Sequence, residues 1–226
     1  MTSIPIGLSR DLPERRVMRA LVQGHDLAVW RSASGRLTAW DNRCPHRGMR
    51  LSHGFVRGES LACLYHGWQY AAETGRCQHI PAHPDLEPPA TICARAHPVA
   101  EAGGLIWVSV AGPLAIPQAG PATAPLRSIT AEAGPEALRA ALVATPLDGA
   151  TPESVEGDTL LRVSIAGIAL TAALQPLPEG QTTAHLLVAP GTVRADLTRL
   201  SRWSEEVRRA AEAARTVAPA RQEEPA

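Results

Sequence analysis

Apolar residues in the first half of the chain fall in short runs separated by polar turns. Within residues 17–41 the runs are interrupted at GHD and SASG, and GLIWVSV (104–110) forms another apolar run. Short runs of this kind, rich in β-branched and aromatic residues and bounded by turn residues, are typical of antiparallel strands. The pattern therefore predicts an all-β domain over residues 1–110.

A proline-rich segment follows, AGPLAIPQAGPATAP at residues 111–125. It has no periodic apolar face, and regularly spaced prolines make a segment semi-rigid and extended. We therefore expect a linker here, and a domain boundary with it.

The second half mixes helical and strand patterns. PEALRAALVATP (135–146) predicts a helix, with Pro135 in its first turn, where the missing N–H costs nothing. Residues 159–177 and 182–190 predict strands joined by a hairpin at PEGQ (178–181). These elements predict a small α+β domain over residues 126–216, so the fold class of the whole chain is α+β.

A long helix is predicted from about Thr192. Its apolar residues recur at steps of three and four, which places them on one face; they are Leu197, Leu200, Trp203, Val207, Ala210 and Ala214. The polar tail at 217–226 predicts disorder.

Charge and cysteine usage limit the partners and the compartment. The chain has 22 basic and 22 acidic residues, so no excess of positive charge favours nucleic acid or an anionic membrane. No apolar run reaches the ~18–20 residues that a membrane helix needs. A chain of this length with only 4 cysteines fits a reducing cytoplasm, where cysteines close to histidines usually mean metal.

Four residues of metal-ligand type lie in two short segments. CPHRG supplies Cys44 and His46, and CLYHGW supplies Cys63 and His66. Zinc and iron–sulfur clusters both accept such donors, but in zinc fingers the cysteines pair with each other and the histidines follow. Here each segment contributes one Cys and one His, which favours a [2Fe–2S] cluster with two thiolates on one iron and two imidazoles on the other.

These segments resemble the Rieske proteins, and in particular the N-terminal domain of Rieske non-haem iron oxygenases. The resemblance spans roughly residues 5–110 and rests on CPHRG, LSHG, CLYHGW, ETGRCQHIPAHP and GLIWVSV. It implies an inner iron bound by Cys44 and Cys63 and an outer iron bound by His46 and His66. Cys77 and Cys93 fall outside this pattern and are expected to be buried or idle thiols.

Two positions that differ from the respiratory Rieske proteins indicate a low-potential centre of the oxygenase type. Those proteins carry an extra, disulfide-bonded cysteine in each loop, where this chain has Met49 and Tyr65. Fewer hydrogen bonds to the sulfurs are then expected, which predicts a potential near the low end of the Rieske range, roughly −150 mV.

A Rieske oxygenase also needs a mononuclear iron held by two histidines and a carboxylate. The second half resembles a truncated helix-grip domain, yet no histidine lies between His97 and His185. A family-like Leu-Asp pair ends at Asp148, but the histidines expected after it are missing. We therefore expect the mononuclear site to be absent and name no catalytic residues.

The sequence thus predicts an electron-transfer component of an oxygenase system. The chain would be an oxidoreductase component that lacks a mononuclear iron site of its own. A ferredoxin or flavin reductase would donate single electrons, and an intact oxygenase subunit in a hetero-oligomer would accept them. One alternative is an oxygenase with an atypical iron site, built from His185 with Asp148, Glu153 or Asp158. Another is a non-catalytic structural or regulatory subunit.

Overall fold

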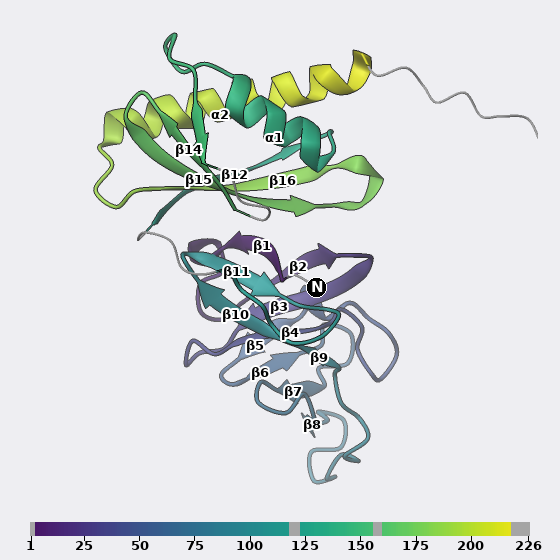
Figure 1. The fold of residues 1–226 in the computed structure, drawn as a ribbon. Helices are drawn as coiled ribbons and strands as arrows, with labels where there is room; N and C mark the ends of the chain where they lie inside the picture. Colours follow the sequence, from purple (N-terminus) through teal and green to yellow (C-terminus); the bar gives the residue numbers. More distant parts are fainter. Residues whose placement is uncertain (1–2, 118–122, 156–159, 218–226) are drawn as a thin grey trace, which may run out of the picture. The chain divides into compact units, whose positions relative to one another are not determined.

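The computed structural model describes residues 3–117, 123–155 and 160–217. It divides the chain into two compact units, Met1–Gly120 and Pro121–Ala226. The first is all β apart from short 3₁₀ turns, and the second combines a sheet with two helices (Figure 1). The predicted α+β class is confirmed.

A sheet of order β2-β3-β4-β9 forms the middle layer of the first unit. All its strand pairs are antiparallel, and the strands are β2 (Arg16–Val22), β3 (His25–Arg31), β4 (Leu37–Asp41) and β9 (Ala96–His97). Successive side chains of a strand point to opposite faces. Leu27 and Val29 of β3 therefore enter one apolar core, while Ala28 and Trp30 enter another.

Two smaller antiparallel sheets lie in the same unit. The first has the order β1-β11-β10, with strands β1 (Ile4–Leu8), β11 (Leu105–Val108) and β10 (Val99–Ala102). The second has the order β5-β6-β7-β8, with strands β5 (Phe55–Arg57), β6 (Ser60–Ala62), β7 (Gln69–Ala71) and β8 (Cys77–His79). Cys44 and Cys63 belong to the core that joins the second of these sheets to Trp30 and Trp40 of the middle layer.

The second unit contains an antiparallel sheet of order β12-β16-β15-β14-β13. Its strands are β12 (Ala124–Ala131), β13 (Glu153–Val155), β14 (Leu160–Ile165), β15 (Ile168–Pro176) and β16 (Thr182–Val188). Helices α1 (Pro135–Ala144) and α2 (Arg194–Val217) cover one face of it. Neither is long and apolar enough to cross a membrane, and no other helix in the described ranges is.

Several sequence predictions for this unit need correction. The single strand predicted over residues 159–177 is wrong. The described part of this segment forms β14 and β15, because Ala166 and Gly167 have φ of 49° and 76° and make a tight turn. Strand β12 was not predicted, and it begins at Ala124 within the proposed linker. The hairpin at 178–181 is confirmed, with β15 and β16 paired on either side of it.

The helix predictions hold better. Helix α1 begins at Pro135 and ends before Pro146, where Thr145 is extended with ψ of 119° because proline disfavours a helical residue before it. Helix α2 begins at Arg194, close to the expected Thr192. Of the predicted tail at 217–226, residue 217 ends α2 and the remainder lies outside the described residues.

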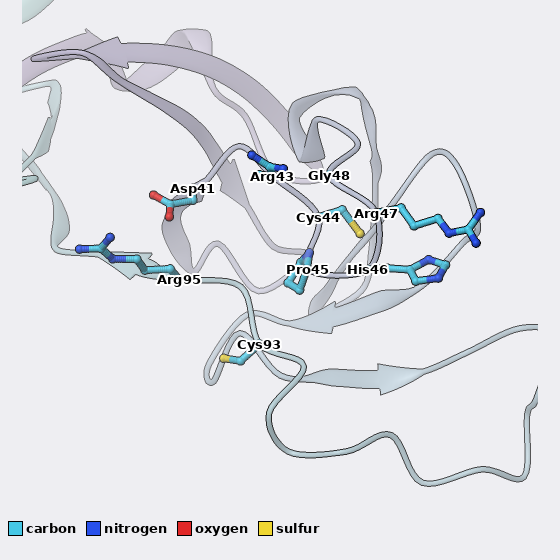
Figure 2. A pocket seen from close by; sticks show the side chains of 9 residues that line it. All are labelled: Asp41, Arg43, Cys44, Pro45, His46, Arg47, Gly48, Cys93 and Arg95. Atoms are coloured by element: carbon cyan, nitrogen blue, oxygen red, sulfur yellow. The ribbon is translucent and has the colours of Figure 1, made fainter.

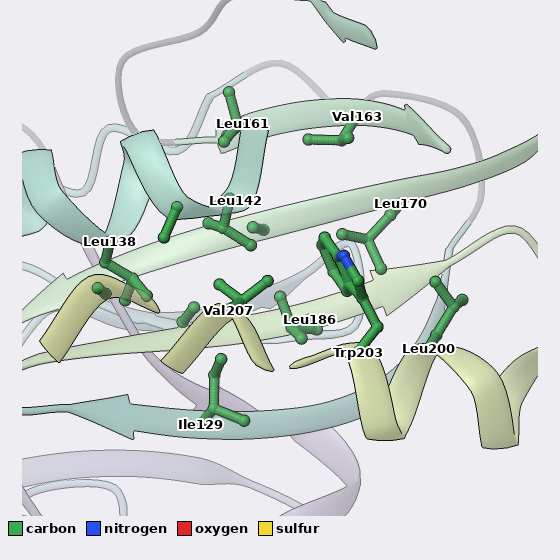
Figure 3. Close-up of a cluster of buried hydrophobic side chains, with 14 of the residues drawn as sticks. Ile129, Leu138, Leu142, Leu161, Val163, Leu170, Leu186, Leu200, Trp203 and Val207 are labelled. Carbon is green, nitrogen blue, oxygen red and sulfur yellow. The ribbon is translucent and has the colours of Figure 1, made fainter. Parts of the chain in front are cut away.

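The buried stripe of α2 differs from the predicted one at its C-terminal end. Ala210 and Ala214 are exposed, and Ala211 is buried instead. A four-residue step from the buried Val207 leads to Ala211, so the helical period keeps that residue on the inner face. Figure 3 shows the resulting core, in which Trp203 and Val207 of α2 lie beside side chains of α1 and the sheet.

Trp203 has a central place in this core. Its side chain is fully buried, and its indole N–H donates to the carbonyl of Thr145 at 2.9 Å, which links α2 to the end of α1. We expect Trp203→Ala to lower the free energy of unfolding of the second unit by about 3–5 kcal/mol. Hydrogen exchange of amides in β14–β16 measures this change. The neighbouring exposed variant Arg202→Ala is expected to alter it by less than about 0.5 kcal/mol; equal effects would contradict the assignment.

Candidate metal centre

The first ligand segment is a tight loop closed by two backbone hydrogen bonds. The Cys44 N–H donates to the Met49 carbonyl at 2.8 Å, and the Gly48 N–H donates to the Cys44 carbonyl at 2.8 Å. Gly48 has φ of +76°, a conformation that residues with a Cβ adopt only under strain. The loop therefore needs glycine four residues after its cysteine.

The second ligand segment repeats this geometry. The Cys63 N–H donates to the Trp68 carbonyl at 2.9 Å, and the Gly67 N–H donates to the Cys63 carbonyl at 3.0 Å. Gly67 has φ of +71°, and a Cβ added there would lie 3.0 Å from Cγ of Pro81. Two loops of equivalent backbone structure thus carry the four proposed ligand side chains.

The two cysteine side chains are buried and close to each other. Burial raises the pKa of the Cys63 thiol, and the neighbouring Cys44 raises it further, while the backbone N–H groups of Tyr65 and His66 act in the opposite direction. Two buried thiolates side by side are costly unless a cation compensates them. The pair is therefore suited to a bound metal, with backbone amides already directed at one of the sulfurs.

A tyrosine hydroxyl contacts the other sulfur. Tyr70 Oη lies 3.1 Å from Cys44 Sγ. Burial raises the pKa of the Tyr70 phenol, and the hydrogen bond to Cys44 adds to this effect. The phenol consequently stays protonated and can donate to a Cys44 thiolate. Neither ligand loop indicates this donor in the sequence, because Tyr70 belongs to strand β7.

The two histidines lie beside each other at the rim of the site. Their ring centroids are 4.6 Å apart, and both side chains are half-buried. Trp68 stacks on His46 at 4.0 Å with an angle of 5°, and Tyr65 stacks on His66 at 3.9 Å. Aromatic side chains of the second loop thus fix both imidazole rings.

The electrostatics favour a neutral imidazole at His46. Burial lowers the pKa of His46, and the nearby His66 and Arg47 lower it further. Neutral imidazole is the form that binds metal. Two buried thiols and two adjoining imidazoles, each pair contributed by both loops, fit the donor set of a Rieske-type [2Fe–2S] cluster. The proposed ligands Cys44, His46, Cys63 and His66 are therefore brought together in one place.

A polar cavity of about 330 Å³ borders the first loop (Figure 2). Its lining residues are Asp41, Arg43, Cys44, Pro45, His46, Arg47, Gly48, Cys93 and Arg95. The three arginine side chains extend in different directions in Figure 2, so they do not converge on a single anion.

Cys77 and Cys93 are not among the four proposed ligands. Cys77 is buried and its thiol contacts the His79 carbonyl at 3.7 Å, whereas Cys93 is exposed. None of the four cysteines forms a disulfide.

The atypical iron site considered for the second unit is not assembled in the parts that the structure describes. His185 is buried, with Nδ1 2.8 Å from Ser128 Oγ and Nε2 3.2 Å from Gln175 Oε1, so both ring nitrogens have polar partners. Asp148 instead pairs with Arg199 at 2.6 Å. Glu153 is an exposed residue of β13, and Asp158 lies outside the described residues.

Comparison with known proteins agrees with this geometry. Residues 2–91 match the model of the Rieske [2Fe-2S] domain. The chain is 46% identical over 109 residues to the oxidoreductase NdmD of Pseudomonas putida, covering 48% of this chain and 18% of that protein. It is 44% identical over 101 residues to the 4beta-methylsterol monooxygenase of Methylococcus capsulatus, covering 43% of this chain and 27% of that protein. The match therefore spans less than a third of each of these relatives.

Solved structures resemble the chain over both units. A Pseudomonas putida NdmA mutant crystallised with theobromine has a TM-score of 0.74 at 16% identity, covering 100% of this chain and 85% of that one. Dicamba monooxygenase has a TM-score of 0.68 at 20% identity, covering 97% of this chain and 90% of that one. At such identities the likeness concerns the fold alone.

The fold and the donor set define an iron–sulfur protein with mixed cysteine and histidine ligation. More particularly, the chain contains a Rieske [2Fe–2S] domain homologous to those of Rieske oxygenase components, followed by a second, small α+β unit.

The ligand assignment can be tested with all four cysteines of the chain. We expect Cys44→Ala and Cys63→Ala to abolish the visible iron–sulfur absorption and the bound iron, because each removes a thiolate ligand. Cys77→Ala and Cys93→Ala serve as controls and are expected to keep both. Retention of the spectrum and of iron in either ligand variant would show that the assignment is wrong.

The Tyr70 hydroxyl is expected to raise the reduction potential. A donor to a ligand sulfur stabilises the more negative, reduced cluster, so Tyr70→Phe is expected to lower the potential by a few tens of mV, the equivalent of one hydrogen bond. Tyr65→Phe is the matched control, since it removes an exposed hydroxyl and keeps the ring stacked on His66. Redox titration followed by electron paramagnetic resonance measures both. An unchanged potential in Tyr70→Phe would exclude this hydrogen bond as a determinant.

Proposed function

We propose that the chain is the Rieske-type electron-transfer component of a non-haem iron oxygenase system. It would take single electrons from a ferredoxin or flavin reductase and pass them to a partner oxygenase subunit. The observation that carries this proposal is the ligand set itself, since a Rieske-type [2Fe–2S] cluster supplies reversible one-electron chemistry when bound.

The arrangement of the ligands supports a direction for electron exchange. Cys44 and Cys63 are buried, whereas His46 and His66 are partly accessible. The histidine edge is therefore the part of the site that a partner can approach most closely. Leu64 and Tyr65 are 48% and 57% exposed next to His66, and they give this edge apolar and aromatic side chains of the kind found in the core of protein interfaces.

The second unit supports a donor role rather than independent oxygenation. A mononuclear iron of this class needs two histidines and a carboxylate with open positions. His185 is the one histidine between residues 126 and 226, and its ring nitrogens contact Ser128 and Gln175. The catalytic iron of the proposed system would accordingly belong to the partner subunit.

Turnover with and without a partner tests this proposal. The purified chain, with two irons and two acid-labile sulfides in its cluster, is expected to be reduced by NADH and a ferredoxin reductase but to oxidise no substrate alone. An intact Rieske oxygenase subunit of the same system is then added with its own cluster in the oxidised state. This addition is expected to give O₂-dependent product. Substrate oxidation by the chain alone that is lost in His185→Ala would overturn the proposal and favour the atypical oxygenase.

The docking edge has its own matched pair of variants. Leu64→Asp is expected to slow electron transfer to the partner at least about tenfold without changing the visible spectrum, because a charge at the apolar core of an interface is desolvated. Val193→Asp, at a residue 60% exposed in the second unit, is the control. Stopped-flow absorbance measures the rates, and equal rates for both variants would place the docking surface elsewhere.

A further inference from the structure

A second group of metal-ligand side chains lies in the Rieske domain, apart from the cluster ligands. His25, Asp41 and His97 each offer one ligand atom, and these atoms all lie within 4.8 Å of one another. His97 Nε2 is 2.6 Å from Asp41 Oδ1, and the two imidazole rings approach edge to face with centroids 5.8 Å apart. No sequence motif indicates this group, because its members are far apart in the chain.

Strand register explains why these three residues meet. Asp41 pairs with Leu27 across β3 and β4, and His97 pairs with Ala39 across β4 and β9. His25 precedes Leu27 by two residues, and Asp41 follows Ala39 by two residues. Side chains two apart share a face, so His25, Asp41 and His97 lie on one face of three neighbouring strands as diagonal neighbours, within reach of long side chains.

The carboxylate is held in place and is not already neutralised by arginine. The backbone of Asp41 is fixed on both sides, since its N–H donates to the Arg95 carbonyl at 2.9 Å and its carbonyl accepts from the Arg43 N–H at 2.7 Å. Among the described residues, the side chain of Asp41 forms an ion pair with His97 and with no arginine. The neighbouring Asp26 is instead engaged by Arg19. A carboxylate that contacts an imidazole but forms no ion pair with an arginine is thus available to a cation.

The three donors differ in exposure, with one buried histidine and a carboxylate that solvent can reach. The His97 side chain is 3% exposed, whereas that of Asp41 is 37% exposed and lines the cavity of about 330 Å³. The cavity is lined by Asp41 but not by His25 or His97, so water can approach the group from the carboxylate side. Catalytic zinc sites commonly combine three protein ligands of these types with one water.

Bond lengths are compatible with this ligand set after small rotations. Zinc bonds of about 2.0–2.1 Å in tetrahedral geometry place neighbouring donors roughly 3.3 Å apart. The 2.6 Å contact between His97 and Asp41 would widen, and the donors now up to 4.8 Å apart would close. We propose that His25, Asp41 and His97 bind one divalent first-row transition-metal ion, with Zn²⁺ the best fit, at a site separate from the cluster.

Zinc binding to the cluster-loaded chain tests the site. After treatment with a chelator, the wild type is expected to bind one equivalent of Zn²⁺ by equilibrium dialysis and elemental analysis, with its cluster iron and visible spectrum unchanged. His25→Gln and Asp41→Asn are expected to weaken binding at least tenfold. His83→Gln changes an exposed histidine elsewhere in the domain and is the control.

The variants are chosen so that folding does not decide the result. His97 is buried, so the half-buried His25 and Asp41 carry the test, and the visible cluster spectrum reports an intact domain. A chelatable iron found at the site and lost in His25→Gln would also support the proposal, with Fe²⁺ as occupant. No bound ion in the wild type, or equal binding by wild type and His25→Gln, would reduce the group to a hydrogen-bonded His97–Asp41 pair. Neither outcome bears on the electron-transfer proposal, which depends on the cluster alone.

Discussion

The structure of the Rieske domain depends on two buried sulfur donors that lie next to each other. Cys44 and Cys63 come from separate loops, and burial raises the pKa of the Cys63 thiol. A protein interior does not stabilise two adjoining thiolates without positive charge. A bound iron–sulfur cluster would supply the positive charge that this core requires, so cluster binding and folding are expected to be coupled.

Aromatic side chains give the site its precision. Trp68 stacks on His46, Tyr65 stacks on His66, and the Tyr70 hydroxyl contacts Cys44 Sγ. Such contacts outside the ligand set orient the ligands and adjust the potential of the metal. The lack of extra cysteines in the loops is expected to lower the reduction potential of the cluster. The phenol of Tyr70 is expected to raise it, so the two effects oppose each other.

The second unit is well packed and contains a buried histidine. Its helices cover one face of the sheet with a continuous apolar core, and His185 is buried with polar partners at both ring nitrogens. A histidine bonded in this way fixes neighbouring strands, since β12, β15 and β16 each supply one member of the group formed by Ser128, Gln175 and His185. The unit keeps the fold of Rieske oxygenase structures while the described residues assemble no mononuclear iron site in it.

Local sequence patterns were sufficient for the cluster loops and the helices. Each loop carries its own Cys, His and Gly within a few residues, and the positive φ of Gly48 and Gly67 follows from the turn that each loop makes. Proline positions likewise set the ends of α1. The same local view failed at residues 159–177, because a two-residue turn at Ala166 and Gly167 interrupts an otherwise continuous apolar run.

What the sequence determined by itself was therefore the class of cofactor and the α+β composition, together with the four residues predicted to bind the cluster. The tertiary structure alone decided which distant residues meet. The Tyr70 hydroxyl reaches Cys44 from another strand, and His25, Asp41 and His97 converge through the register of β3, β4 and β9. The physical reason is that pairing register depends on burial of whole strand faces, so no short motif records which side chains it brings side by side.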